Sequence, residues 1–407
     1  MIIGVTGNAG KTSTKETIAA VLRHSKTVRI AAGNLNNEFG FALTILGDWD
    51  QEYYDHGSSM GLWLRVLWAG CRGLIARRDC AEIFLLEYGA DRPGDIKRLA
   101  MVFKPHIAVI TTVGDTPVHI EFFKNADSVA AEKANLVKVL TAVDYAILNH
   151  DDDRVLDMKS KTEAHVVTYG FEEGSTIRIL DFKYLNTDEG KPTGVAFKIH
   201  EASKFVSVEI GGSLGKSQAY AAAAAAAIGM ALGMNLIQIS EALQQYHGPN
   251  GRLKILSGIN GSTIIDDTYN ASPASTRLAL ETLRDLPGLR KIAMLGDMLE
   301  LGEHTIPAHQ NIGTLAASCA DILVCVGSRA KFIADSAANQ MSKNNIFTFD
   351  VSTGAIKKVR ELVEKGELIL IKGSQGMRME KIVEEIMAES QRKKELLVRQ
   401  SERWLFK

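Results

Sequence analysis

The 407-residue sequence contains little cysteine and no cysteine pair with zinc-binding spacing. Its four cysteines, Cys71, Cys80, Cys319 and Cys325, are scattered, and no C-x-x-C motif occurs. This usage argues against a disulfide framework or a zinc ribbon. It favours a protein of the reducing cytoplasm.

The chain also lacks an excess of charge of either sign. Lysine and arginine number 47 and aspartate and glutamate 48, so the formal net charge is −1. A chain with this balance has no overall field that attracts nucleic acid or an anionic membrane. We therefore expect no nucleic-acid partner.

Long hydrophobic runs are scarce as well. Residues 1–5 form a short apolar run that is typical of a core strand, so we expect no signal peptide. The run from Ala219 to Ile237 is long but mostly alanine and glycine. These residues gain little on entering a bilayer, so the run predicts a packed helix and no membrane span.

A phosphate-binding loop is the most informative feature present. Residues 7–14 read Gly-Asn-Ala-Gly-Lys-Thr-Ser-Thr and directly follow the apolar run. The strict motif would have glycine at Val5, so this is the shorter G-x-x-G-K-T form. Strand, glycine turn and helix start together present backbone N–H groups to an anion, and a helix is expected from Thr14 to about His24. The residues expected to contact a nucleotide are Gly7, Asn8, Ala9, Gly10, Lys11, Thr12 and Ser13, with Thr12 also a magnesium ligand.

The rest of the chain alternates short apolar runs with amphipathic stretches, which predicts an α/β fold with a parallel sheet. Residues 164–210 instead alternate in polarity between turn signals and predict antiparallel hairpins added to that sheet. The cluster Gly248-Pro249-Asn250-Gly251 predicts a boundary, followed by a second alternating unit. Expected strands are 83–87, 107–112, 145–149, 263–267, 291–296, 322–326 and 368–372; expected helices are 127–140 and 219–232, with a charged helical tail at 388–407.

Three further groups could act beside a bound triphosphate. Glu87 ends the apolar strand 83–87, and the carboxyl ends of parallel strands are where ligands bind. Its carboxylate is therefore a candidate magnesium ligand or general base. His119 follows another predicted strand through a Gly-Asp-Thr-Pro loop, and Lys133 lies on a helix fourteen positions later.

These residues resemble the ATPase domain of the Mur ligase family. The matching segments are Gly7–Thr14, Gly33–Glu38, Glu87–Ala90, His119 and Lys133. The second unit resembles the branch that adds D-alanyl-D-alanine to a peptidoglycan precursor, through Gly251–Leu253, Asp266–Pro273, Leu295–Gly302 and Lys372–Ser374. The resemblance spans about residues 1–390 and implies a central ATP-binding domain at 1–247, a Rossmann-like C-terminal domain at 251–388 and a charged tail at 389–407.

The resemblance implies an ATP- and Mg²⁺-dependent ligase of cell wall synthesis. ATP would phosphorylate a substrate carboxylate, and an amine would attack the acyl phosphate to form an amide. By the family pattern Thr12 and Glu87 hold one metal ion, His119 holds the other, and a carbamylated Lys133 positions magnesium. Arg252 would reach the γ-phosphate, Asp267 the ribose, and Asn270 the phosphates or the amine substrate.

The sequence departs from the family in two places. The domain that binds the uridine diphosphate of the sugar-peptide substrate is not seen, so a partner chain could replace it. The helix that carries His-Asn-x-x-Asn in the family reads Ser217-Gln218-Ala219-Tyr220-Ala221, so Gln218 or Asn149 is expected to contact the adenine instead.

An insertion at residues 60–78 carries Leu62, Trp63, Leu64, Val66, Leu67 and Trp68 with Arg65 and Arg72 between them. It is read either as a helix docked on the sheet, or as a substrate platform or a patch against a membrane or partner. Three functions stay open: a D-alanyl-D-alanine-adding ligase, a ligase of the same fold for another carboxylate (as in folylpolyglutamate or cyanophycin synthetases), and a partner-dependent nucleotide-binding subunit.

Overall fold

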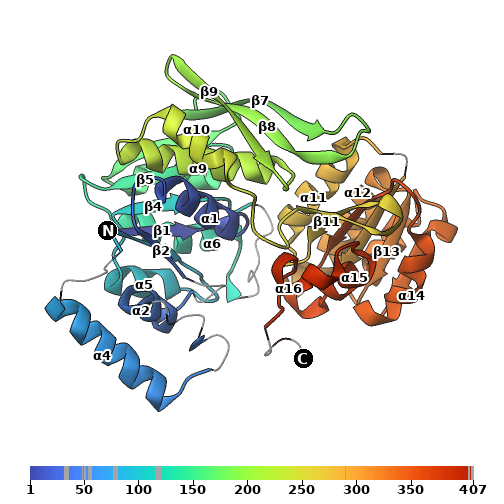
Figure 1. Cartoon of the computed structure of the whole chain (residues 1–407), viewed down its shortest axis with the longest axis horizontal. Helices are drawn as coiled ribbons and strands as arrows, with labels where there is room; N and C mark the ends of the chain where they lie inside the picture. Colours follow the sequence, from blue (N-terminus) through green and yellow to red (C-terminus); the bar gives the residue numbers. More distant parts are fainter. Residues whose placement is uncertain are drawn as a thin grey trace.

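A computed structural model shows two α/β units, one on each side of Figure 1. It describes residues 1–31, 36–47, 49, 52–53, 57–76, 81–114, 122–288, 290–401 and 404. The first sheet runs from residue 2 to residue 211 and the second from 254 to 372, so the Gly248–Gly251 cluster lies between them.

The first sheet contains nine strands within the described residues, in the order β2-β3-β1-β4-β5-β6-β7-β8-β9. Strands β1 to β6 are parallel, and β7, β8 and β9 form two antiparallel hairpins. Their bounds are β1 Ile2–Thr6, β2 Val28–Ile30, β3 Ile83–Glu87, β4 Ile107–Ile110, β5 Tyr145–Asn149, β6 His165–Gly170, β7 Ile177–Asn186, β8 Pro192–Glu201 and β9 Lys204–Gly211.

The appended hairpins are therefore confirmed for 177–211 but not for the start of the predicted region. Strand β6 lies parallel to β5 from His165 to Tyr169 and parallel to β7 at Tyr169 and Gly170. The reason is the connection, because β5 and β6 are joined by the short helix α8, Asp153–Leu156, rather than by a hairpin turn. Alternating polarity alone does not distinguish these two cases.

Helices cover both faces of the first sheet, as buried parallel strands require. One face packs against α1, α9 and α10, and the other against α2, α5, α6 and α7. The predicted helix at 127–140 is divided in two at Ala134. The bounds are α1 Lys11–Leu22, α2 Glu38–Leu46, α5 Asp95–Val102, α6 Ala126–Lys133, α7 Asn135–Lys138, α9 Lys216–Ala231 and α10 Leu236–Gln244.

The alanine run is a packed helix, as predicted. Alanines 222 to 226 of α9 are 0 % exposed, and α9 lies between α1 and strands β5 to β7. Only small side chains let a helix approach neighbours on several sides at once. Among the helices in the described part of the chain, none has the length and apolarity needed to cross a membrane.

The second sheet has the order β10-β11-β15-β12-β13-β14, with only β10 antiparallel. The four predicted central strands are confirmed, whereas the edge strands β10 and β14 were missed because they are short and half-buried. The bounds are β10 Lys254–Ser257, β11 Thr263–Asp267, β12 Lys291–Gly296, β13 Ile322–Val326, β14 Ile346–Phe349 and β15 Leu368–Lys372, with α11 Pro273–Asp285, α12 Thr305–Cys319, α13 Lys331–Ala337, α14 Ser352–Leu362 and α15 Glu380–Ile386.

The last segment is less helical than predicted. Beyond residue 388 the only α-helix of the described residues is α16, Lys393–Leu396, preceded by a single 3-10 turn. Leu397 is buried in the core of the second unit, and Arg399 donates to the carbonyl oxygens of Thr268 and Tyr269. The tail is therefore held in place by these contacts to the loop after β11, and not by helical structure of its own.

The α9 packing gives a stability prediction. Ala224→Leu adds a branched side chain at a fully buried core position, and overpacking should lower the free energy of unfolding by about 1–3 kcal/mol. Urea unfolding followed by circular dichroism would measure the change. Ala231→Leu, at the partly exposed last residue of the same helix, is the matched control. A loss in Ala231→Leu as large as that in Ala224→Leu would contradict the packing argument.

Candidate active site

The phosphate-binding loop is fixed against the end of strand β4. The Asn8 amide N–H donates to the Thr112 carbonyl at 2.6 Å, and the Thr111 hydroxyl donates to the Ala9 carbonyl at 2.7 Å. Gly10, at φ 84°, turns the chain into α1 in a conformation that glycine favours. A Cβ on Gly7 would lie 1.9 Å from the Thr111 hydroxyl, so the turn has no room for a larger residue.

Lys11 opens α1 and folds back over this loop. Its ammonium donates to the Gly7 carbonyl at 2.8 Å. Burial lowers the pKa of Lys11, Glu87 opposes that shift, and Arg252 adds to it. A cation held inside the loop at a helix N-terminus is an electrostatic complement to a phosphate group.

Thr12 joins the loop to the end of strand β3. Its hydroxyl donates to Glu87 Oε2 at 3.3 Å, and Glu87 is buried. A hydroxyl and a carboxylate oxygen beside a phosphate cradle are the donors that magnesium prefers. Within the described residues no three His, Cys, Asp or Glu side chains converge as a protein-only metal site requires. Thr12 and Glu87 therefore fit a magnesium ion that takes its remaining ligands from phosphate and water.

Lys133, at the end of α6, is buried in the same region. Burial and the charge of Lys11 lower its pKa to about 7, against smaller opposite effects of Glu132, Glu87 and Asp91. The neighbouring Glu132 does not pair with it. Its carboxylate instead accepts from the amides of Gly94 and Ile96 at the start of α5.

Arg252 reaches the phosphate-binding loop from the second unit. Its Nη2 donates to the Thr12 hydroxyl at 3.3 Å, and its guanidinium lies over the Tyr269 ring, 4.1 Å from the centroid. A planar guanidinium stacked in this way keeps its donors free at the edge. The structure thus brings Lys11, Thr12, Glu87 and Arg252 to one place from both sides of the boundary.

These groups line a pocket of about 150 Å³ between the two units. Its lining includes the first turn of α11, where the N-cap Ser272 and Ser275 form a capping box on either side of Pro273. Two helix N-termini, those of α1 and α11, therefore border one pocket. The second was not predicted, although the run Asn-Ala-Ser-Pro is a helix-start signal. The lining residues are Asn8, Ala9, Gly10, Lys11, Thr12, Asn36, Glu87, Arg252, Tyr269, Asn270, Ala271, Ser272, Ser275 and Gln375.

Two predicted ligands of the second unit have internal partners. Asp267 accepts from the buried Lys372 ammonium at 2.6 Å and from the Leu253 amide at 3.3 Å. Asn270 lines the pocket, while its side-chain oxygen accepts from the Ala271 amide. Asp267 thus holds strand β15 through Lys372, and it also holds Leu253, the residue after Arg252. Its contact with a ribose stays a prediction.

Gln218 and Asn149, the two predicted adenine contacts, are both buried. Gln218 is buried at the start of α9, and its amide lies 3.5 Å from the Arg252 carbonyl. Asn149 is buried and donates to the Thr112 hydroxyl. Neither lines the pocket, so both adenine contacts stay predictions. His119 and residues 33–35 lie outside the described residues.

The C-terminal segment supports the Arg252 side of the site, which the sequence did not predict. The Arg399 guanidinium donates to the Tyr269 carbonyl at 2.7 Å and to Glu380 at 3.1 Å. Asn250 donates to the Glu395 carbonyl just before Arg252. A lone arginine in a charged tail gives no sequence signal for such a contact.

Comparisons with known proteins agree with this geometry. The Mur ligase middle domain model matches residues 74–229, and the Mur ligase glutamate ligase domain model matches residues 251–375. The UDP-N-acetylmuramoyl-tripeptide–D-alanyl-D-alanine ligase of Rickettsia prowazekii is 29 % identical over 94 % of this chain and 77 % of its own length.

Two solved structures have the same arrangement of elements. MurF from Acinetobacter baumannii superposes with a TM-score of 0.75 at 25 % identity, over 94 % of this chain and 75 % of that one. MurF ligase from Thermotoga maritima, solved with ADP, also gives 0.75 at 25 % identity, over 95 % and 79 %. The chain belongs to the Mur ligase family of ATP-dependent ligases.

Proposed function

We propose that this protein joins D-alanyl-D-alanine to a peptidoglycan precursor peptide at the expense of ATP. The observation that carries the proposal is the pocket in which Lys11 and Thr12 of the first unit meet Arg252 of the second. The relatives that act on UDP-N-acetylmuramoyl-tripeptide and D-alanyl-D-alanine support the choice of substrates. The dependence on ATP favours a reaction in the cytoplasm.

The residues suit a two-step condensation. In the first step the γ-phosphoryl group of ATP moves to a substrate carboxylate oxygen, and ADP leaves. In the second an amine nitrogen attacks the acyl carbon, phosphate leaves and the nitrogen loses a proton. Phosphoryl transfer needs positioned charge rather than covalent help from the protein. Lys11 and Arg252 provide two cations, and the starts of α1 and α11 provide backbone dipoles.

Magnesium, when bound, would neutralise phosphate charge and orient the oxygens. Thr12 and Glu87 would hold one ion, and the resemblance assigns His119 and a carbamylated Lys133 to magnesium as well. The pKa of about 7 favours this modification of Lys133, because carbon dioxide reacts with a neutral amine. The carbamate would exchange a buried cation beside Lys11 for an anion that a hard cation prefers.

A substrate-omission assay tests the proposal. Phosphate release from ATP is measured with UDP-N-acetylmuramoyl-tripeptide and D-alanyl-D-alanine together and with each alone, and the product mass is determined. We expect full release and the amide product only with both substrates. Phosphate could instead be released with the amine and a different carboxylate but not with the tripeptide. In that case the assigned acceptor would be wrong, although the protein would still be a ligase. Full activity would also make a partner chain unnecessary.

We predict that Lys11→Ala removes nearly all turnover. Losing a preorganised cation from a phosphoryl-transfer site costs on the order of a hundredfold or more in rate. Phosphate release measures the loss, and an unchanged melting temperature shows that the mutant is folded. Lys159→Ala, at an exposed lysine far from the loop in sequence, is the control and should keep parent activity. A folded Lys11→Ala enzyme with normal turnover would remove the phosphate-binding role.

We also predict that the activity of the enzyme depends on carbon dioxide, which would modify Lys133. After carbon dioxide has been removed, reactivation at a fixed concentration of dissolved carbon dioxide should become faster as the pH rises through about 7, since the lowered pKa leaves more neutral amine above that pH. Lys133→Ala should be inactive and should regain part of its rate with a short carboxylate. Parent-level activity in Lys133→Ala without rescue would contradict the modification. Lys138→Ala, on the next helix, is the matched control.

For Arg252→Ala we expect retained ATP affinity and a large fall in kcat. The phosphate-binding loop belongs to the first unit and would hold the nucleotide without Arg252, whose guanidinium would act where charge develops. Arg252→Lys keeps the charge but loses the planar stack on Tyr269, so it should recover only part of the rate. Titration calorimetry and steady-state rates separate the two effects. Equal losses in affinity and rate would mean that Arg252 binds the ground state.

A further inference from the structure

Helix α4, Met60–Ala76, is apolar on two faces, and the first unit covers only one of them. On the inner face Leu62 and Val66 are buried with Leu43 of α2. The insertion is therefore a docked helix, but it packs on α2 and not on the sheet, as one of the two interpretations had expected. It stands at the margin of the molecule in Figure 1, away from the second unit.

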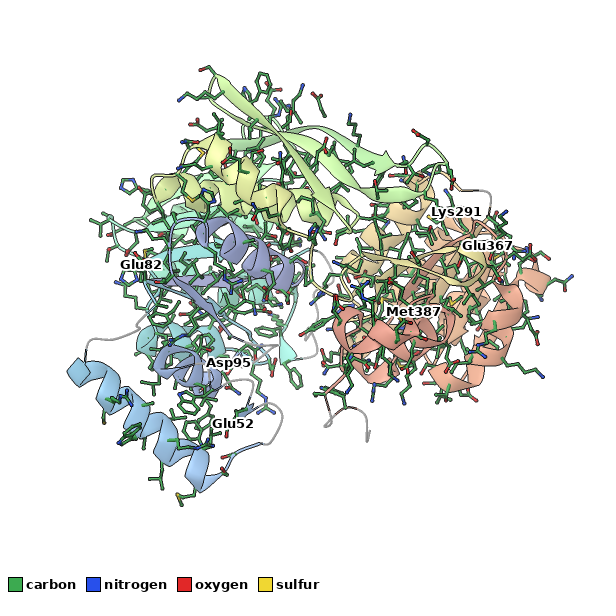
Figure 2. All side chains as sticks on the ribbon, in the orientation of Figure 1. Glu52, Glu82, Asp95, Lys291, Glu367 and Met387 are labelled. Atoms are coloured by element: carbon green, nitrogen blue, oxygen red, sulfur yellow. The ribbon has the colours of Figure 1, made fainter. Side chains whose placement is uncertain are left out.

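The outward face is a stripe of large apolar side chains. Met60, Leu64, Leu67 and Trp68 are 79 %, 61 %, 58 % and 65 % exposed, and Cys71 is exposed beside them. Their spacing of four, three, one and three residues puts all five on one side of an α-helix. Figure 2 shows side chains of α4 projecting into open space on the side away from α2. A continuous exposed apolar stripe on a folded domain marks an interaction surface.

The charged residues within the helix itself are both arginines, Arg65 and Arg72. Residues 57–78 contain four arginines and no aspartate, glutamate or lysine. On a helix with 3.6 residues per turn, Arg65 and Arg72 fall together along one edge of the stripe. The Arg72 guanidinium lies 5.5 Å from the centre of the Trp68 ring, while Arg65 pairs with Glu52, which Figure 2 labels near the helix. The balanced charge of the whole chain therefore conceals a local basic and apolar surface.

We propose that the outward face of α4 binds the surface of a phospholipid bilayer that contains anionic lipids. A helix with leucine and tryptophan on one side and arginine at its edge is typical of segments that lie in the plane of the membrane interface. Tryptophan sits at headgroup depth, and arginine can reach anionic headgroups with its stem against acyl chains. The inner face stays bound to α2, so docking requires no unfolding.

A second copy of the chain fits this surface less well. A stable protein interface has about 20–30 residues on each side. The stripe offers five side chains on a single helix, and Arg72 at its edge would repel the same residue of an identical helix. A bilayer needs no matching surface and is attracted by the same arginines.

Vesicle flotation of the full chain tests the proposal without use of the ligase activity. The vesicles contain phosphatidylcholine alone or a mixture with phosphatidylglycerol. We expect binding to the mixed vesicles, weaker binding at high salt, and little binding to phosphatidylcholine alone. The double variant Leu64→Glu/Trp68→Glu should lower the partition coefficient on the order of a hundredfold. The control Phe205→Glu/Ile237→Glu changes two residues that are 63 % and 66 % exposed outside α4 and should bind normally.

Cys71 offers a second readout on the same face. With Cys80→Ser as background, a polarity-sensitive dye on Cys71 should shift to the blue on adding mixed vesicles. The same dye on Ile237→Cys, in a Cys71→Ser/Cys80→Ser background, should not shift. The other described cysteines, Cys319 and Cys325, are buried and take little label.

Three outcomes would overturn the proposal. The parent protein could fail to float with the mixed vesicles. The control pair could lose binding as strongly as the α4 pair. Sedimentation could show a dimer that Leu64→Glu/Trp68→Glu dissociates while no vesicle binding occurs, in which case a second copy covers the face. A melting temperature near that of the parent shows that each variant is folded.

Discussion

The contact on which the site depends is at the Thr12 hydroxyl. This group donates to Glu87 in the first unit and accepts from Arg252 in the second, both at 3.3 Å. One small side chain thus connects the phosphate-binding loop, the end of strand β3 and the segment after the boundary. Two neighbouring contacts keep these parts in position: Thr111 fixes the loop, and Tyr269 fixes the guanidinium of Arg252.

The pocket receives one cation from each unit, Lys11 from the first and Arg252 from the second. Lys11 and Arg252 each oppose the positive charge of the other, and Arg252 contributes to the lowered pKa of Lys11. Two half-buried cations beside a single carboxylate, Glu87, are costly unless a further anion lies between them. A triphosphate supplies that anion and would therefore stabilise the association of the two units as well as fill the pocket.

The sequence predicted the first unit's loop and central strands well, because both have strong local signals. Gly10 and Lys11 belong to a motif whose backbone conformation follows from its residues, and strands such as 83–87 are continuously apolar. Contacts between distant segments were missed. Nothing near Arg399 in the sequence points to Tyr269, and nothing in Asp267 shows that Lys372 neutralises it. Gln218 was proposed for the adenine because the family asparagine is replaced by Ala221; that contact stays a prediction, and the structure adds that Gln218 is buried against the Arg252 backbone.

The Arg399 contact has a consequence for the order in which the protein is made. The ribosome makes the phosphate-binding loop well before Arg399, which fixes Tyr269 and lies nearly four hundred positions later in the chain. A nascent chain could therefore fold its nucleotide-binding half while the Arg252 loop still lacks its support. The pocket that Tyr269 and Arg252 complete would then form only after Arg399 has left the ribosome, later than the nucleotide-binding half.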